Sequence, residues 1–190
     1  MSHMFPESLV DPAFLPPGES ETRSPGDTAR AICIRAAGVS DVAGLSAYFT
    51  GLSTTSRNKR FMGARADIAA VAAECLPDAG RPDHFTLLAE VGGEGRSTIV
   101  GETRYAYDAA AGWGEFAISV ADAFQRRGLG LSLMTAMEMR AIDLGHEMIA
   151  GDAARTNAEM RGLARKAGFS PAEPNDWQSV HFVKHLTPRM

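Results

Sequence analysis

Cysteine is scarce in this chain: Cys33 and Cys75 are the only two among 190 residues, and they lie far apart. Two thiols at this spacing suit neither a metal site nor a disulfide scaffold, so they favour a reducing, cytoplasmic compartment. Neither has a nearby histidine pattern, which argues against a cysteine nucleophile.

Long apolar runs and a positive net charge are also missing. No stretch approaches the roughly 20 apolar residues that span a bilayer, so we expect no membrane contact. The N-terminus lacks a basic segment followed by an apolar one, which argues against a secretory signal. The net charge of −4 makes the whole chain a poor candidate for nucleic-acid binding.

The chain does contain enough material for one globular domain. Hydrophobic residues make up 45% of it and charged residues 22%, values typical of a folded protein with a real core. Residues 1–30 carry prolines among small and acidic residues and show no period of 2 or 3.6. A flexible N-terminal tail is therefore predicted at 1–30, followed by a folded domain at 31–190.

Strand and helix patterns alternate along that domain. Strands are predicted at residues 31–37, 84–91, 97–107, 113–120, 148–153 and 178–186. Helices are predicted at residues 40–50, 53–60, 67–76, 128–144 and 156–167. For the last helix, Thr156 followed by Glu159 predicts a capping box. The order of elements indicates an α/β (α+β) fold with a mixed, mostly antiparallel central sheet and flanking helices.

The turn between the strand at 113–120 and the long helix carries the strongest functional signal. The first amides of a helix have no internal partner, and the helix dipole adds partial positive charge there. Gly128 and Gly130 leave such amides open to a pyrophosphate, and Arg126 and Arg127 can add charge-assisted contacts. The turn therefore predicts a site for a phosphate-bearing ligand.

A plain strand-to-helix turn with solvated arginines is the structural alternative. The turn is too short for the loop G-x-x-x-x-G-K-[ST], and it lacks the three glycines of a dinucleotide fingerprint. A phosphate-binding module of another fold stays open only if the second motif, described next, is accidental.

Two motifs resemble the GNAT superfamily of N-acetyltransferases. The signature [QR]-x-x-G-x-[GA] between a strand and a helix matches Gln125, Gly128 and Gly130. A helix that is led by Asn157 and ends in Gly-Phe at 168–169 matches the second motif. The resemblance covers about residues 31–186. Short segments at 51–61 and 115–118 are similar to the acetyltransferase domain of some bacterial protein-lysine acetyltransferases.

The resemblance implies that acetyl-CoA lies between the strands at 113–120 and 148–153. The backbone at Ile118 and Val120 would bind the pantetheine arm, and Asn157 would lie near the thioester. A local bond from Asn157 to the helix backbone is the alternative. The coenzyme pyrophosphate would be held by the turn, which comprises Gln125, Arg126, Arg127, Gly128, Leu129 and Gly130.

In the implied reaction, a primary amine directly attacks the thioester of acetyl-CoA. The amine belongs to a small molecule or to a protein lysine. An alkyl amine has a pKa of about 10.4 and arrives protonated, so a base is needed. Glu115 is the candidate, because many family members place a glutamate near this position. A strand-end carboxylate in water is the alternative role, and Glu102 is the reserve base.

One family feature is missing from the last helix. Family members often place a tyrosine acid in a Leu-Tyr pair before Gly-Phe, whereas this chain has Leu163-Ala164. Tyr105 and Tyr107 are the candidates to replace it, and the sequence does not choose between them. A thiol with a pKa near 8.5 leaves tolerably well unprotonated. A non-catalytic acyl-CoA-binding sensor is therefore the alternative function.

Two further groups of polar side chains bear on function. His181 and His185 can share a strand face, but a metal site needs a third ligand that the sequence does not supply, so no metal is expected. The basic cluster of Arg57, Lys59 and Arg60 is interpreted as a solvated helix face. The alternative is that it contacts an acidic acceptor substrate. The oligomeric state, a homodimer included, stays open.

Overall fold

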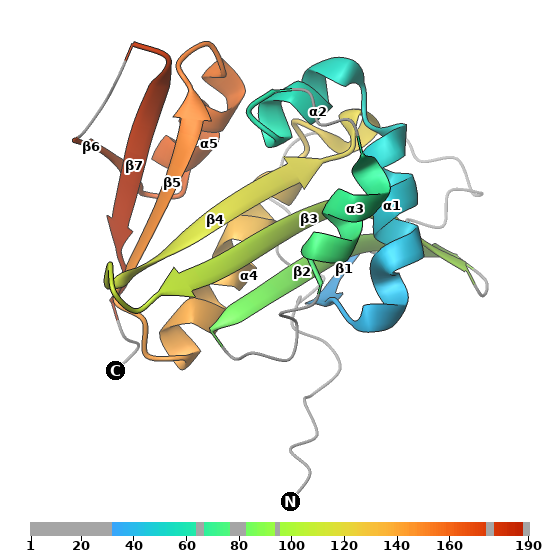
Figure 1. Ribbon diagram of the computed structural model, residues 1–190, viewed down its shortest axis with the longest axis horizontal. Helices are drawn as coiled ribbons and strands as arrows, with labels where there is room; N and C mark the ends of the chain where they lie inside the picture. The colour runs from blue at the N-terminus through green and yellow to red at the C-terminus, as the bar shows by residue number, and fades with distance from the viewer. Residues whose placement is uncertain (1–31, 64–66, 77–82, 94–95, 174–176, 188–190) are drawn as a thin grey trace, which may run out of the picture.

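The computed structural model describes residues 32–63, 67–76, 83–93, 96–173 and 177–187, and these form a seven-stranded sheet flanked by helices (Figure 1). The predicted tail at 1–30 lies outside the described residues. No helix in the described part of the chain has the length and apolar character that a bilayer crossing requires.

The strands are β1 (Ile32–Ala36), β2 (His84–Gly93), β3 (Arg96–Asp108), β4 (Trp113–Val120), β5 (Met148–Ala154), β6 (Ser170–Ala172) and β7 (Ser179–His185).

The sheet is mixed and mostly antiparallel, which confirms the predicted fold class. Its strand order is β1-β2-β3-β4-β5-β7-β6, and only β4 and β5 run parallel. Strand β6 was not predicted, because three residues that include a proline are too short to show a period. The helices are α1 (Val42–Gly51), α2 (Thr54–Arg60), α3 (Ile68–Glu74), α4 (Leu129–Asp143) and α5 (Ala158–Lys166).

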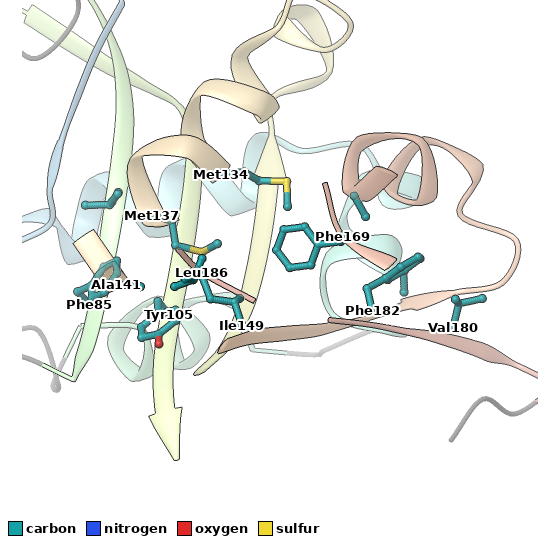
Figure 2. Packing of buried hydrophobic residues seen from close by; sticks show 13 residues of the cluster. Phe85, Tyr105, Met134, Met137, Ala141, Ile149, Phe169, Val180, Phe182 and Leu186 are labelled. Carbon is teal, nitrogen blue, oxygen red and sulfur yellow. The ribbon is translucent and has the colours of Figure 1, made fainter. Parts of the chain in front are cut away.

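Helices cover both faces of the sheet, with α4 behind it and α1 and α3 in front in the view of Figure 1. Helix α4 buries one stripe of apolar side chains, since Leu133, Met134, Met137 and Ala141 are all fully buried. Figure 2 shows how Met134, Met137 and Ala141 meet residues of β5, β7 and the α5–β6 connection. On the other face, Leu45 and Phe49 of α1 pack with α3.

Strands β4 and β5 separate soon after they meet. Only two pairs of residues are paired between the two strands: Gly114 with Ile149, and Glu115 with Ala150. Beyond that point the Phe116 ring lies against the backbone of Gly151, where a Cβ atom would overlap it, and it also packs on the Phe169 ring at 5.3 Å. An aromatic ring therefore fills the vertex at which the two strands part.

The start of α5 differs from the prediction. Asn157, rather than Thr156, is the N-cap, and its Oδ1 accepts a hydrogen bond from the amide of Met160 at 3.1 Å. The capping box of Thr156 and Glu159 is therefore wrong by one residue. An asparagine oxygen caps a helix at least as well as a threonine hydroxyl does, so two adjacent candidates were hard to separate by sequence.

Replacing Gly151 by alanine tests the packing at this vertex. We expect the free energy of unfolding to fall by about 1–3 kcal/mol, because the new methyl group overlaps the Phe116 ring. Urea unfolding measures the change, and Gly51→Ala is the control, since a Cβ atom there meets nothing within 4 Å. A second change, Phe116→Leu, should recover part of the loss; strictly additive effects would contradict the contact.

Candidate active site

A cavity of about 710 Å³ occupies the split between β4 and β5. Its lining includes β4 residues from both faces of the sheet: Glu115, Ala117 and Ser119 point one way, and Phe116, Ile118 and Val120 the other. A cavity can touch both faces only where the sheet is open. The helices contribute Ser56, Lys59 and Arg60 from α2, Gly130 and Leu131 from α4, and Ala158, Glu159, Met160, Gly162, Leu163 and Lys166 from α5.

The phosphate turn at 125–130 borders one end of this cavity. Arg126 and Gly128 have left-handed backbones, with φ of 64° and 88°. Hydrogen bonding inside α4 begins only at Leu131, whose amide bonds to the Gly128 carbonyl at 2.9 Å. In the described part of the chain, no acceptor lies within hydrogen-bonding reach of the amides of residues 126–130. Five consecutive open amides at a helix start form a site that favours an anion.

The two arginines of the turn have different surroundings. Arg126 lines the cavity, together with Lys166 of α5. Arg127 lies outside the lining, and its guanidinium sits over the Phe124 ring at 5.8 Å. Gly130 leaves little room for a side chain, because a Cβ atom there would lie 3.1 Å from Leu163 Cδ2. The structure thus brings Arg126 to the cavity and leaves Arg127 on its outer side.

The side chain of Gln125 forms hydrogen bonds within the protein. Its Nε2 donates to the Val120 carbonyl at 2.9 Å and to Ser56 Oγ at 3.2 Å. Both amide hydrogens therefore hold the turn against β4 and α2. Val120 lines the cavity with Ile118, but its carbonyl already has this internal partner.

Glu115 is exposed and lines the cavity at the point where β4 and β5 part. Its neighbour on the same sheet face, Ala117, is small and leaves the carboxylate accessible from the cavity. Asp152 of β5 also lines the cavity and is paired with His181, its carboxylate lying 3.1 Å from Nδ1. This end of the cavity therefore carries two carboxylates, whereas the turn carries open amides and Arg126.

The reserve base, Glu102, is completely buried and bound in an ion pair. Its carboxylate accepts from Arg60 Nε at 2.7 Å and from Arg60 Nη2 at 3.2 Å. Burial alone would lower the pKa of the Arg60 guanidinium, but the Glu102 charge outweighs it and the pKa is raised. The Arg60 side chain is only 8% exposed, so the interpretation of this residue as part of a solvated face is wrong.

A chain of hydroxyl groups continues from Glu102 toward α1. Ser119 Oγ donates to the Glu102 carboxylate at 2.6 Å and therefore accepts from the Tyr48 hydroxyl at 3.0 Å. Burial is the main cause of a raised pKa at Tyr48, which keeps the phenol protonated. These groups, together with Arg60, saturate Glu102, whereas Glu115 has room for an incoming amine. No residue spacing in the sequence could have paired Arg60 with Glu102.

Neither tyrosine proposed as an acid lines the cavity. Tyr105 is fully buried and hydrogen-bonded to His146 Nδ1 at 2.8 Å, and Tyr107 stacks on the same imidazole with ring centroids 3.8 Å apart. Ala164, which stands where the family tyrosine is expected, is fully buried in the core. The structure therefore does not bring a tyrosine hydroxyl from these positions to the cavity.

The remaining sequence candidates have local roles. Asn157 lines the cavity, is 8% exposed and caps α5 as described above. Within the described residues, no group of three or more histidine, cysteine or acidic side chains could hold a metal ion. Lys59 of α2 forms an ion pair of 3.0 Å with Glu159 of α5, and so bridges the two walls of the cavity.

Replacing Glu102 by alanine should show how far the buried pair holds the structure together. The charge of Arg60 would be left buried without its partner, so we expect the free energy of unfolding to fall by about 3 kcal/mol. Glu159→Ala breaks the exposed pair with Lys59 and should cost less than about 1 kcal/mol. Chemical denaturation of both variants gives the comparison; equal losses would contradict the structural role of Glu102.

Comparison with known proteins agrees with this geometry. The model of the acetyltransferase (GNAT) family matches residues 54–169. A search of curated proteins finds no match. Among solved structures, the GNAT domain of S. lividans PAT is 23% identical, with a TM-score of 0.72 over 80% of this chain and 89% of that chain.

Two further solved structures share the fold at lower identity. YncA from Salmonella typhimurium, solved with its cofactor acetyl-CoA, is 18% identical, with a TM-score of 0.63 over 84% of this chain and 96% of that one. The ribosomal-protein-S5-alanine acetyltransferase from Vibrio fischeri is 13% identical, with a TM-score of 0.66 over 82% and 93%. The split sheet, the open turn and the matched family model together show that this chain belongs to the GNAT acetyltransferase family.

Proposed function

We propose that this protein transfers an acetyl group from acetyl-CoA to a primary amine, on a small molecule or a protein lysine, by direct attack of the amine on the thioester. The observation that carries the proposal is one continuous cavity that runs from the turn with open amides, where Arg126, Gly128 and Gly130 line it, to an exposed carboxylate, Glu115. The first binds phosphate, and the second can accept a proton.

The coenzyme fits the cavity from the turn inward. The amides of residues 126–130, with Arg126 and Lys166 beside them, would bind the pyrophosphate. Between Phe116 and Val120, the edge of β4 that faces β5 has no strand partner, because pairing with β5 ends at Glu115. An extended pantetheine arm carries amides that can bond to such a strand edge. The YncA complex with acetyl-CoA supports this choice of ligand.

The acyl transfer then needs a proton acceptor at the far end of the arm. The ammonium form of the acceptor amine must lose a proton before its lone pair can attack the thioester carbon. Among the described carboxylates that line the cavity, Glu115 is the one without an ion pair, since Asp152 is paired with His181 and Glu159 with Lys59. The thiolate that leaves needs little help, because a thiolate is a far weaker base than an alkoxide.

A coenzyme-binding sensor without turnover is the second candidate. It is favoured by Ala164, which is buried where the family tyrosine is expected, and by the placement of Tyr105 and Tyr107 outside the cavity lining. Both candidates share the coenzyme site and differ only in the use of Glu115. Release of free thiol from acetyl-CoA in the presence of a panel of amines separates them.

The two arginines of the turn provide a matched test of coenzyme binding. We expect Arg126→Ala to raise the Kd for coenzyme A about tenfold, because a charge-assisted contact to phosphate is lost. Arg127→Ala should change it by less than about threefold, because Arg127 stacks on Phe124 outside the cavity. Isothermal titration measures both constants. The reverse order would show that the pyrophosphate lies on the other side of the turn.

Replacing Glu115 by glutamine tests the proposed base. General-base catalysis is typically worth 100-fold or more, so we expect thiol release with a reactive amine to slow about 100-fold at neutral pH. The affinity for coenzyme A should stay unchanged, because Glu115 lies at the opposite end of the cavity from the turn. Glu147→Gln, which alters an exposed carboxylate outside the cavity lining, is the control. Unchanged turnover in the Glu115 variant would refute this assignment.

A further inference from the structure

Helix α2 forms a wall of the cavity but has little apolar support. It lines the cavity with Ser56, Lys59 and Arg60, yet none of its seven residues is fully buried. An amphipathic helix normally takes its place by burying an apolar stripe. The seven residues of α2 are therefore held by polar contacts, between the flanking apolar residues Leu52 and Phe61.

The contact at the C-terminal end is the Arg60–Glu102 ion pair, and the contact at the N-terminal end is a single carboxylate, Asp122. Asp122 lies in the short 3-10 turn between β4 and the phosphate turn. It accepts three hydrogen bonds from the start of α2: from the Ser53 amide at 3.0 Å, from Ser53 Oγ at 2.7 Å and from Ser56 Oγ at 2.8 Å. The Ser53 amide bond is the first cause of a lowered pKa at Asp122.

The same network continues into the phosphate turn itself. Ser56 Oγ, which donates to Asp122, accepts from Gln125 Nε2, and Gln125 is the first residue of the turn. Ser53 Oγ also accepts from the Ser56 amide at 3.2 Å and so caps α2. Two residues three positions apart, Asp122 and Gln125, therefore tie the start of α2 to the segment that would bind phosphate.

The conformation of that segment is one that a bound anion would stabilise. Arg126 has a left-handed backbone, which is unfavourable for a residue with a side chain, and among the described residues the five amides of 126–130 have no acceptor. A phosphate that bonds to these amides stabilises this conformation over others. Any residue that is fixed in space by the turn is then fixed more firmly when the coenzyme is bound.

We propose that Asp122 is a positioning residue, which transmits occupancy of the phosphate turn to helix α2 and so fixes the acceptor side of the cavity more firmly when the coenzyme is bound. This inference rests on the proposed function, because it takes coenzyme A as the ligand of the turn. Asp122 acts through Ser53 and Ser56 and does not touch the reacting atoms. Its effect reaches the chemistry through Lys59 and Arg60, which α2 places in the cavity wall.

Amide hydrogen exchange in the full chain tests the proposal, with coenzyme A as the probe. In the unaltered protein, coenzyme A should slow exchange across residues 54–60 by about threefold or more, the effect of roughly one net hydrogen bond. In Asp122→Ala, coenzyme A should still bind within about threefold of its original Kd, but the slowing in α2 should disappear. Asp122→Asn keeps an oxygen acceptor and should retain part of the slowing of exchange in α2.

Two further variants keep the test decisive. Asp108→Ala removes a carboxylate that accepts from two turn amides, those of Ala110 and Ala111, away from the cavity, and should leave the slowing unchanged. Ser56→Ala removes the link from the α2 side and should abolish it, even if Asp122→Ala is poorly folded. If the Asp122 and Ser56 variants showed the same slowing as the unaltered protein, or if the unaltered protein bound coenzyme A without slowing, the inference would be overturned. Failure of the unaltered protein to bind coenzyme A would instead overturn the proposed function.

Discussion

Strands β4 and β5 pair for only two residues, and the site depends on their separation beyond Glu115. Backbone groups on the facing edges of two strands normally satisfy each other, but beyond Glu115 the edge of β4 has no strand partner in β5, and its Val120 carbonyl is taken by Gln125 Nε2. The Phe116 ring at the vertex and the missing side chain of Gly151 fit the strands together just below the split. Because the sheet is open there, one cavity reaches from the α4 and α5 side through to the side of α2.

That passage places unlike chemistry at its two ends. In the proposed function, the open amides and Arg126 bind an anion at the start of α4, and Glu115 takes the proton of the acceptor amine. Polar contacts between segments distant in sequence hold the walls in place, most of all the buried pair of Arg60 and Glu102. This pair explains why two glutamates on neighbouring strands have different roles: one is saturated by hydrogen bonds, and the other is accessible.

Local patterns in the sequence predicted most of the fold. The six predicted strands, the five predicted helices and the helix end at Gly168, which has a positive φ, were all confirmed. These features depend on neighbours in the sequence. Strand β6 was missed, and the cap of α5 was assigned to Thr156 instead of Asn157, because short elements leave too few residues for a pattern. The pairing of Arg60 with Glu102 and of Asp122 with α2 depends on tertiary contacts, which no spacing encodes.

The central claim is that the amides of residues 126–130 bind the diphosphate of the coenzyme. Amide ¹⁵N–¹H chemical shifts, followed during parallel titrations with coenzyme A and with pantetheine, test it most directly. The account predicts that coenzyme A shifts these five amides strongly, whereas pantetheine, which lacks the diphosphate, moves only signals along β4. If coenzyme A bound without moving these amides, or pantetheine moved them equally, the phosphate would have to bind elsewhere and the account would fail.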